Sequence, residues 1–308
     1  MICPITYDET TERYSPAALR LLSPRTRSLH DFPYSAAEQL REAALRASKI
    51  SIQGVQPKLS CTFSAARGIF ELMDSGGTYI LKPQHPQYPE LPENEDLSMR
   101  LAATAGIDVP FHGLIYCTDG TLTYFIKRFD RLPRGKKLAV EDFSQLQAQT
   151  RETKYASSME KVAETVERFC SFPAVAKPAL FRRMLVAFLI GNEDMHLKNF
   201  SVLTRAGMTD LSPAYDMVNT TIALPAVTEE TALPIFGKKS RLTREIFFAY
   251  FARERLRLQP GIIDKIALEL STALDTRWPH LIDLSFLSQG SKDRYRTLVA
   301  QRRERLGL

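Results

Sequence analysis

Apolar and polar residues alternate with the spacing of β-strands in the first half of the chain. Between residues 59 and 128, short apolar runs are separated by turn segments such as Ala65–Gly68 and Asp74–Gly77, which is the pattern of paired strands. The first three runs predict a meander, and a helix at Glu93–Ala105 follows them. Five strands are expected in all, at Leu59–Ser64, Ile69–Met73, Thr78–Lys82, Phe111–Cys117 and Leu122–Arg128.

The second half of the chain has the spacing of helices. After Arg131, apolar residues recur at three- and four-residue intervals, as on the buried face of a helix. The expected helices are Asp142–Gln149, Met159–Cys170, Ala176–Ile190, Thr243–Arg257, Ile262–Ala273 and Lys292–Leu306. The first 45 residues instead contain four prolines and predict an irregular arm that leads into a short helix at Ala36–Leu45.

These elements predict an α+β fold with two lobes. A small, β-rich N-lobe is expected over residues 1–130, with the irregular arm, a loop before the first strand and the five-stranded sheet. A larger, mostly helical C-lobe is expected over residues 131–308. Because the chain has 308 residues and is 44% hydrophobic, it can bury a core of roughly two domains.

Composition restricts the class of protein without identifying it. No apolar run reaches membrane-spanning length and Met1–Pro4 does not begin a signal peptide, so we expect a cytoplasmic protein without membrane association. The four cysteines are far apart, which predicts reduced, buried thiols and neither disulfides nor a zinc site. The net charge of +6 favours polyanionic partners such as nucleotides. The cysteines are Cys3, Cys61, Cys117 and Cys170.

One polar stretch, Gly191–Phe200, directly follows the apolar run Phe181–Ile190. Polar residues at the end of a buried helix are costly unless they are solvated or used. Asp194 and Asn199 are separated by four residues, and Asp216 follows seventeen residues after Asn199. This spacing is typical of a phosphoryl-transfer centre, in which the first carboxylate takes the acceptor's proton and the other two side chains hold metal ions. The alternative is an ordinary helix-terminal loop with Asn as a cap.

The strands, the following helix and this loop together have the plan of a bilobal protein kinase. Lys82 ends the third predicted strand, and Glu95 begins the next helix, where it could form the strand–helix ion pair of kinases. Taken alone, Lys82 could also be an exposed lysine at a strand end. The nucleotide is expected between the lobes, near the segment Lys127–Asp130.

The loop before the first strand, Ser51–Lys58, occupies the place of a phosphate-covering loop. It has the single glycine Gly54, in place of the glycine-rich pattern of ordinary protein kinases. Backbone amides around Gly54 and the Lys58 ammonium could still cradle phosphates. A plain loop is the alternative interpretation.

Seven motifs, in this order, resemble the HipA family of bacterial toxin serine/threonine kinases. The resemblance spans about residues 48–240 and implies an ATP- and magnesium-dependent kinase of a toxin–antitoxin module. The motifs are Ser51–Lys58, Tyr79–Pro83, Asn94-Glu95, Lys127–Arg131, Glu141–Gln145, Asn192–Asn199 and Pro213–Met217.

The resemblance also implies roles for single residues. Asp194 would be the catalytic base and Asn199 and Asp216 the metal ligands. Lys82, paired with Glu95, would contact phosphates, Ser51 is at the autophosphorylated position, and Ser48 lies close enough to be a second site. The remaining nucleotide-binding positions are Gln53, Gly54, Val55, Gln56, Lys58, Lys127, Phe129, Gln145 and His196.

About fifty residues precede the phosphate loop, where full-length HipA proteins have a longer subdomain. The chain therefore resembles the short HipT type, which implies a separate small HipS-like protein and a HipB-like DNA-binding antitoxin as partners. HipA-like kinases act on aminoacyl-tRNA synthetases, and for this type the tryptophanyl enzyme is expected before the glutamyl one. Direct binding of nucleic acid is not expected outside such a complex.

Two other functions stay open from the sequence. A small-molecule kinase shares the Asp-x-x-x-x-Asn loop and the bilobal plan, but the carboxylate-rich acceptor pocket that it needs is not evident. An interaction module could keep the fold without activity, although intact Lys82, Asp194, Asn199 and Asp216 argue against it. The basic final helix, with Arg294, Arg296, Arg302, Arg303 and Arg305, is interpreted as a solvated helix face.

Overall fold

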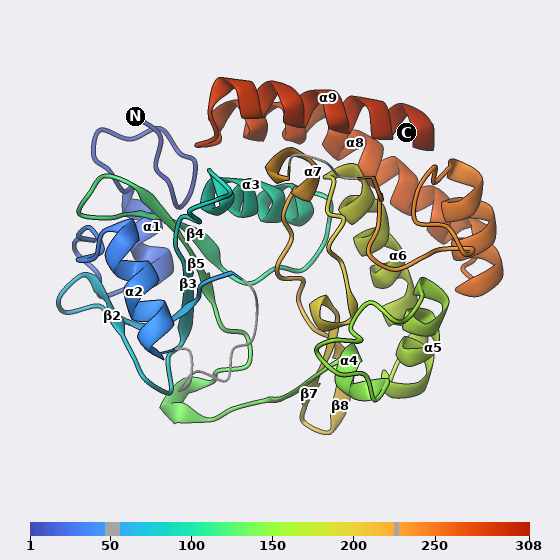
Figure 1. Ribbon diagram of the computed structural model, residues 1–308, viewed down its shortest axis with the longest axis horizontal. Helices are drawn as coiled ribbons and strands as arrows, with labels where there is room; N and C mark the ends of the chain where they lie inside the picture. Colours follow the sequence, from blue (N-terminus) through green and yellow to red (C-terminus); the bar gives the residue numbers. More distant parts are fainter. Residues whose placement is uncertain (47–55, 225–227) are drawn as a thin grey trace. The chain divides into compact units, whose positions relative to one another are not determined.

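The computed structural model describes residues 1–46, 56–224 and 228–308, which form two compact units (Figure 1). The first unit comprises Met1–Leu97, Pro110–Gly135 and Leu284–Leu287. The second unit comprises Ser98–Val109, Lys136–Asp283 and Ser288–Leu308. Both units contain helices and strands, so the predicted α+β class is confirmed.

The first unit is built on an antiparallel five-stranded sheet in the order β2-β1-β3-β5-β4. The five predicted strands are present, but the predicted meander is wrong, because β3 pairs with β1 and not with β2. The chain reaches β3 by passing closely against β1 at Gly77, where a Cβ would lie 2.2 Å from Ser60 Oγ. The strands are β1 (Leu59–Ser64), β2 (Ile69–Leu72), β3 (Tyr79–Lys82), β4 (His112–Tyr116) and β5 (Leu122–Lys127).

The N-terminal arm is more ordered than the prolines suggest. It contains helix α1 (Pro16–Leu22), which Ser15 caps, and it ends in the expected helix α2 (Ala36–Arg46). Its backbone also forms hydrogen bonds with the edge strand β4. The Leu114 N–H donates to the Pro4 carbonyl at 3.1 Å, and the Phe32 N–H donates to the Tyr116 carbonyl at 2.8 Å. The arm therefore covers an edge that would otherwise expose unpaired backbone groups.

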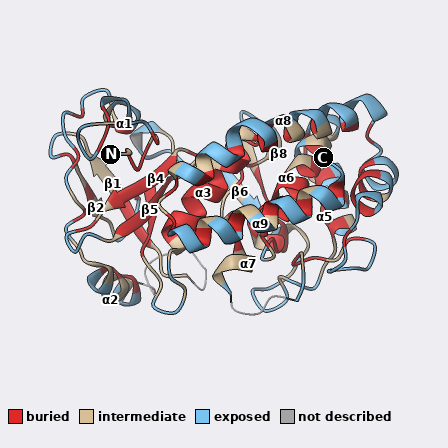
Figure 2. Ribbon diagram, turned by 90° about the horizontal axis from the view of Figure 1, so that it is seen from above, coloured by how far each residue is buried: buried red, intermediate tan, exposed pale blue. Residues whose placement is uncertain are grey.

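Helix α6 (Pro173–Leu189) forms the core of the second unit, since it is buried along most of its length (Figure 2). Helices α5 (Met159–Phe169) and α9 (Gln289–Leu306), strand β8 (Met208–Leu211) and the segment Glu245–Arg255 pack against it. The long helix α8 (Pro260–Leu284) extends the predicted Ile262–Ala273 at both ends. The other helical elements are α3 (Leu91–Thr104), α7 (Thr220–Ala223) and the short turns η1 (Pro133–Gly135) and η2 (Leu197–Asn199).

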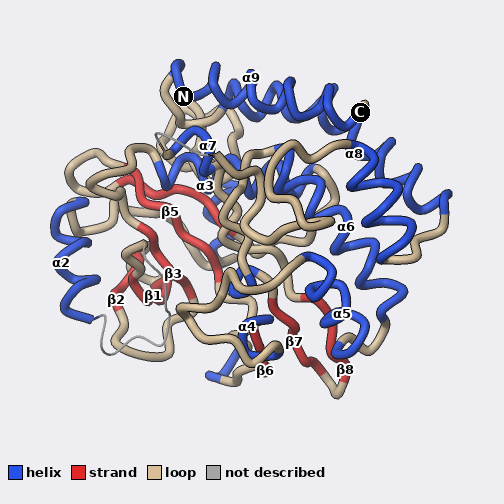
Figure 3. The backbone as a smooth tube through the Cα atoms, turned by 45° about the vertical axis from the view of Figure 1, so that its right-hand side comes forward, coloured by secondary structure: helices blue, strands red, loops and turns tan. Residues whose placement is uncertain are grey.

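A second sheet, which the sequence pattern did not predict, lies beside α4 (Phe143–Leu146) and α5 (Figure 3). Its strands are short and half-buried, so they lack the apolar runs that identify strands. The predicted helix Asp142–Gln149 is correspondingly reduced to α4 (Phe143–Leu146), because Asp142 ends a strand. The strands are β6 (Ala139–Asp142), β7 (Ser201–Arg205) and β8 (Met208–Leu211), in the order β6-β7-β8.

Two smaller findings concern the helix Thr243–Arg257 and the cysteines. The segment Glu245–Arg255 is a wide π-helix, which residue spacing does not distinguish from an α-helix. All four cysteines are buried and unpaired, as predicted. Within the described residues, no helix has the length and hydropathy that a membrane crossing requires.

Candidate active site

The predicted catalytic loop of the second unit, residues 191–200, begins just after α6 ends, at Gly191. Gly191 has a φ of +74°, and the Asn192 N–H bonds back to the Ala187 carbonyl at 2.9 Å, which is a common way to end a helix. A Cβ at residue 191 would lie 2.5 Å from Leu298 Cδ2 and 2.7 Å from Thr221 Oγ1. Glycine is therefore required both by the backbone angle and by the neighbouring side chains.

The main chain around Asp194 is fixed by the loop itself. Its N–H donates to Asn192 Oδ1 at 3.2 Å, and its carbonyl accepts from Asn199 Nδ2 at 3.0 Å and from the His196 N–H at 2.8 Å. The Asp194 side chain is 52% exposed. Since the Asn199 amide uses its nitrogen in this contact, its oxygen is left for a ligand.

Asp216 is joined to the catalytic loop from both sides. Asn192 Nδ2 donates to the Asp216 carbonyl at 3.4 Å, and the Tyr215 hydroxyl donates to the Lys198 carbonyl at 3.0 Å. Asp216 has a φ of +54°, a left-handed conformation that is uncommon outside glycine and recurs at functional sites. The loop system thus brings the three predicted catalytic and metal-binding residues together in one unit.

The side chains of Asn199 and Asp216 fit magnesium that is also bound by substrate phosphates. In the described part of the chain, no group of three or more His, Cys, Asp or Glu side chains could hold a metal ion by itself. Magnesium is usually bound by one or two carboxylates together with substrate phosphates, and it prefers oxygen ligands. The Asn199 amide oxygen and the Asp216 carboxylate match that requirement.

His196 is buried between the loop and its neighbours. Burial and the nearby Lys154 ammonium hold the pKa of His196 below its ordinary value, and the Asp194 and Asp216 carboxylates act in the opposite direction. Gln145, which was also predicted to line the pocket, has a structural role in helix α4. Its side chain accepts from the Asp142 N–H at 3.0 Å and so caps helix α4.

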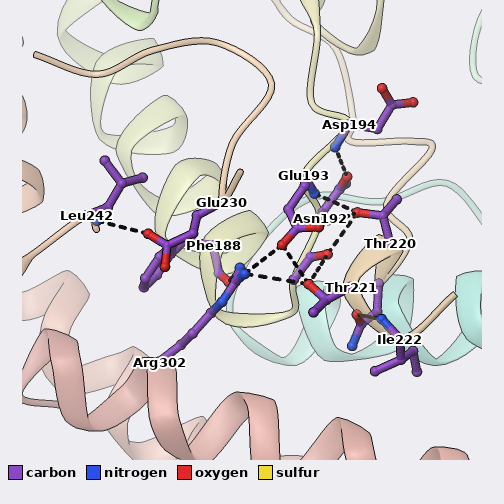
Figure 4. Close-up of polar contacts among 12 residues, drawn as sticks. Phe188, Asn192, Glu193, Asp194, Thr220, Thr221, Ile222, Glu230, Leu242 and Arg302 are labelled. Carbon is purple, nitrogen blue, oxygen red and sulfur yellow. Dashed lines mark hydrogen bonds and ion pairs between the residues drawn. The ribbon is translucent and has the colours of Figure 1, made fainter. Parts of the chain in front are cut away.

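Glu193, directly before Asp194, forms a buried ion pair with Arg302 of helix α9 (Figure 4). The two charged groups are 2.8 Å apart, with exposed fractions of 6% and 4%. Arg302 also donates to the Phe188 carbonyl at 2.6 Å, and Glu193 accepts from Thr221 Oγ1 at 2.8 Å. The interpretation of Arg302 as part of a solvated helix face is therefore wrong.

The sequence contained a signal that Arg302 is buried. The buried residues of α9 follow one helical stripe, and Arg302 lies on this stripe, between two apolar positions. A charged residue at such a position needs a buried partner. The stripe is Ser291, Tyr295, Val299, Arg302 and Leu306.

In the first unit, Lys82 and Glu95 form the predicted strand–helix ion pair, with Nζ and Oε1 2.5 Å apart. Both side chains are almost fully buried, at 3% and 0% exposed. The neighbouring acids of α3 have other partners, because Glu93 accepts from Gln84 at 2.7 Å and Asp96 lies 2.9 Å from His112 Nδ1. The choice of Glu95 as the partner of Lys82 is thereby settled.

The other predicted nucleotide-binding residues of the first unit are spread along the chain. Gln56 and Lys58 are half-buried just before β1, Lys127 is exposed at the end of β5, and Phe129 is half-buried after it. Five predicted residues lie outside the described ones, namely Ser48, Ser51, Gln53, Gly54 and Val55.

If Lys82 contacts phosphate as predicted, replacing it by methionine should weaken ATP binding about ten- to hundredfold, because a charge-assisted contact is lost. The same change leaves the Glu95 carboxylate buried without the ammonium, so it should also reduce stability. The double variant Lys82→Met/Glu95→Gln separates the two effects, since it should recover stability and not ATP affinity. Calorimetry with ATP and urea unfolding measure them. Unchanged ATP affinity in both variants would exclude a phosphate-binding role for Lys82.

Comparison with known proteins identifies the family of the chain. A family model described as the HipA-like C-terminal domain matches residues 50–278. A putative kinase of Haemophilus influenzae is 29% identical over 259 residues, which cover 78% of this chain and 73% of that protein. The serine/threonine-protein kinase toxin HipA of Shewanella oneidensis is 27% identical over 191 residues, which cover 56% of this chain and 43% of that protein. The latter match thus spans less than half of the relative.

The structure of Shewanella oneidensis HipA, solved with HipB and operator DNA, superposes with a TM-score of 0.69 at 21% identity. The superposition covers 92% of this chain and 74% of that chain. A likeness at this identity shows a shared fold. The predicted bilobal, kinase-like fold class is therefore confirmed.

Proposed function

The chain belongs to the HipA-like C-terminal domain family, and from this membership we propose that it is an ATP-dependent serine/threonine protein kinase and the toxin of a bacterial toxin–antitoxin system. The names of its relatives, a putative kinase and a kinase toxin, support the proposal. The observation that carries it is the hydrogen-bonded loop system that holds Asp194, Asn199 and Asp216 together.

In the proposed reaction, Asp194 accepts the proton of a serine or threonine hydroxyl while that oxygen attacks the γ-phosphorus of ATP. A new oxygen–phosphorus bond forms, the bond between the γ-phosphorus and the β,γ-bridging oxygen breaks, and ADP leaves. Asn199 and Asp216 would hold magnesium, which neutralises phosphate charge when it is bound. Lys82, which Glu95 orients through their ion pair, would contact the phosphates.

The remaining contacts to ATP are proposed from the family resemblance. Lys127 and Phe129 would contact adenine, and Gln56, Lys58 and His196 would line the nucleotide site. Gln145 was expected there as well, and its role in capping α4 makes a direct contact less favoured.

The direct test is the intact mass of the purified protein after incubation with ATP and magnesium. Wild-type protein is expected to gain one or more phosphate masses, and an Asp194→Asn variant is expected to gain none. A wild-type protein that transfers phosphate only to a small-molecule acceptor would overturn the assignment as a protein kinase. Absence of any transfer would favour the interaction module.

We propose an aminoacyl-tRNA synthetase as the target, the tryptophanyl enzyme before the glutamyl one. Phosphorylation of such an enzyme would stop translation, so growth arrest in cells should depend on Asp194. Co-expression of each synthetase tests the choice, because excess target should relieve the arrest. If only the glutamyl enzyme relieved the growth arrest, it would be the target in place of the tryptophanyl enzyme. The kinase assignment would stand.

We also propose two protein partners. The solved HipA relative is in a complex with HipB and its operator DNA, which supports a HipB-like antitoxin as one partner. A small HipS-like protein is the other, by analogy with the short HipT type. Co-purification with the products of neighbouring genes tests both.

Ser51 is proposed as an autophosphorylation site that switches the kinase off. A phosphate adds about −1.5 to −2 charges, and near the phosphates of ATP it would repel them. A Ser51→Asp variant should therefore bind ATP more weakly than wild type, and a Ser51→Asn variant, which has a side chain of the same size without the charge, is the matched control. Phosphopeptide mapping should find phosphate on Ser51 in wild type and none in Asp194→Asn. A Ser51→Asp protein with wild-type ATP affinity and activity would disprove the switch.

A further inference from the structure

Two neighbouring residues of the second unit, Lys154 and Tyr155, contact the catalytic loop, although no motif singles them out. They belong to the segment that joins α4 to α5. The Tyr155 hydroxyl donates to Asp194 Oδ1 at 2.5 Å, and Lys154 Nζ lies 2.7 Å from His196 Nε2. The Leu197 N–H also donates to the Lys154 carbonyl at 3.3 Å. Two side-chain bonds and one backbone bond thus tie this pair of residues to the loop.

We propose that Lys154 and Tyr155 are positioning residues for phosphate transfer. Tyr155 holds the Asp194 carboxylate in one orientation and leaves its second oxygen, Oδ2, for the proton of the acceptor. Lys154 holds His196 in one tautomer. The inference rests on the proposed function, because the orientation of Asp194 matters to catalysis only if this carboxylate is the base.

The Asp194 side chain needs such support because the loop holds only its main chain. The bonds to Asn192, Asn199 and His196 all use the Asp194 N–H or carbonyl. Among the described residues, Tyr155 supplies the hydrogen bond to the carboxylate, which is otherwise half exposed to water. A base that must approach an acceptor hydroxyl to within hydrogen-bond distance gains from a fixed orientation.

The tautomer of His196 follows from its neighbour. An ammonium has three donors and no acceptor, so Nε2 of the neutral ring accepts from Lys154 and the proton lies on Nδ1. His196 Nδ1 is buried and has no hydrogen-bond partner in the residues that the structure describes.

The Tyr155–Asp194 contact and the Lys154–His196 contact support each other through the rings of Tyr155 and His196. The Tyr155 ring meets the His196 ring edge-on, with centroids 5.1 Å apart and an angle of 79° between the planes. Lys154 Nζ lies 4.9 Å from the centroid of the Tyr155 ring, within the range of a cation–π contact. The hydroxyl that reaches Asp194 is therefore held from two sides.

The Tyr155→Phe variant tests the role of Tyr155, since it removes the hydroxyl and keeps the ring. We expect kcat for transfer from radiolabelled ATP, to the protein itself and to purified tryptophanyl-tRNA synthetase, to fall about ten- to hundredfold. KM for ATP and the thermal unfolding midpoint should stay at their wild-type values. Tyr250→Phe is the matched control, because it removes a hydroxyl–carboxylate bond to Glu160 in the same unit, and it should keep wild-type kcat.

Lys154→Met should lower kcat as well, and Lys154→Arg, which restores a cation, should recover part of it. Wild-type kcat in both Tyr155→Phe and Lys154→Met, while Asp194→Asn is inactive, would overturn the inference and leave the proposed function standing. Full activity of Asp194→Asn would instead refute the proposed function. Phosphotyrosine at residue 155 in wild type would make Tyr155 an acceptor and so overturn its positioning role.

Discussion

Replacing Asp194 by asparagine is expected to slow phosphate transfer about 10²–10⁴-fold, the contribution typical of a general base. Asparagine keeps the shape of the side chain and can still accept the hydrogen bond from Tyr155, but it cannot take the proton of an acceptor. Because the Asp194 side chain is half exposed, the variant should unfold at the wild-type urea concentration. The rate of transfer from radiolabelled ATP measures the effect.

Asp216→Asn should lower activity at least as strongly, because it removes the negative charge of the proposed magnesium ligand. Asparagine is a better choice than alanine here, since the φ of +54° at this position is tolerated by Asn and Asp and strained for other side chains. An alanine variant would mix loss of the ligand with backbone strain.

Asp210→Asn is the matched control for both changes. Asp210 is an exposed carboxylate on β8 of the same unit, so its loss should leave activity unchanged. A phosphate-transfer rate within threefold of wild type for Asp194→Asn or Asp216→Asn would contradict the roles assigned to these carboxylates.

Replacing Arg302 by methionine is expected to lower the free energy of unfolding by about 3–5 kcal/mol, the cost of removing one partner of a buried ion pair. Burial lowers the pKa of Arg302 and raises that of Glu193, so neither charged group would be stable there without the other. Methionine retains most of the volume but cannot donate to the Phe188 carbonyl, as Arg302 does at 2.6 Å. The larger part of the effect should come from the Glu193 carboxylate left without its partner, and urea unfolding measures it.

The pH dependence identifies Glu193 as the cause. Arg302 lowers the pKa of Glu193, so its removal moves that pKa further above the unfolded value. A carboxyl group with a raised folded pKa favours folding below its unfolded pKa, and this contribution is lost as pH rises through the folded pKa. The deficit of Arg302→Met relative to wild type should accordingly be larger at pH 8 than at pH 5.

Two further variants complete this test. The double variant Arg302→Met/Glu193→Gln removes both charges and should recover part of the lost stability. Arg303→Met, the adjacent position, breaks a more exposed pair with Asp275 and should cost no more than about 1 kcal/mol. Equal losses for Arg302→Met and Arg303→Met would show that the Glu193 pair does not anchor the catalytic loop.

Local sequence patterns were sufficient to predict the elements whose secondary structure depends on their own residues. The five strands of the first sheet have apolar runs between turn residues, and they were placed to within two residues at each end. The ion pair of Lys82 and Glu95 could also be predicted from the sequence, because strand and helix phase determine which side chains face each other. The spacing of Asp194, Asn199 and Asp216 likewise predicted a single centre.

Pairing between segments depended on contacts that no local pattern contains. In the order β2-β1-β3, strand β3 pairs with β1, and Gly77 at the entry to β3 passes close to Ser60. The strands β6 to β8 are short and half-buried, so only their hydrogen bonds to each other define them. The N-terminal arm is ordered because it covers the edge of β4.

By itself the sequence determined the fold class, the strands of the first sheet and the residues proposed for catalysis, because each follows from periodicity or from spacing along a continuous segment. Only the tertiary structure decided which distant groups support them. Arg302 lies more than a hundred residues from Glu193, and Lys154 lies about forty from His196. A buried charge or a half-exposed carboxylate is stabilised by whichever group the fold brings within hydrogen-bond distance, and that distance is independent of separation along the chain.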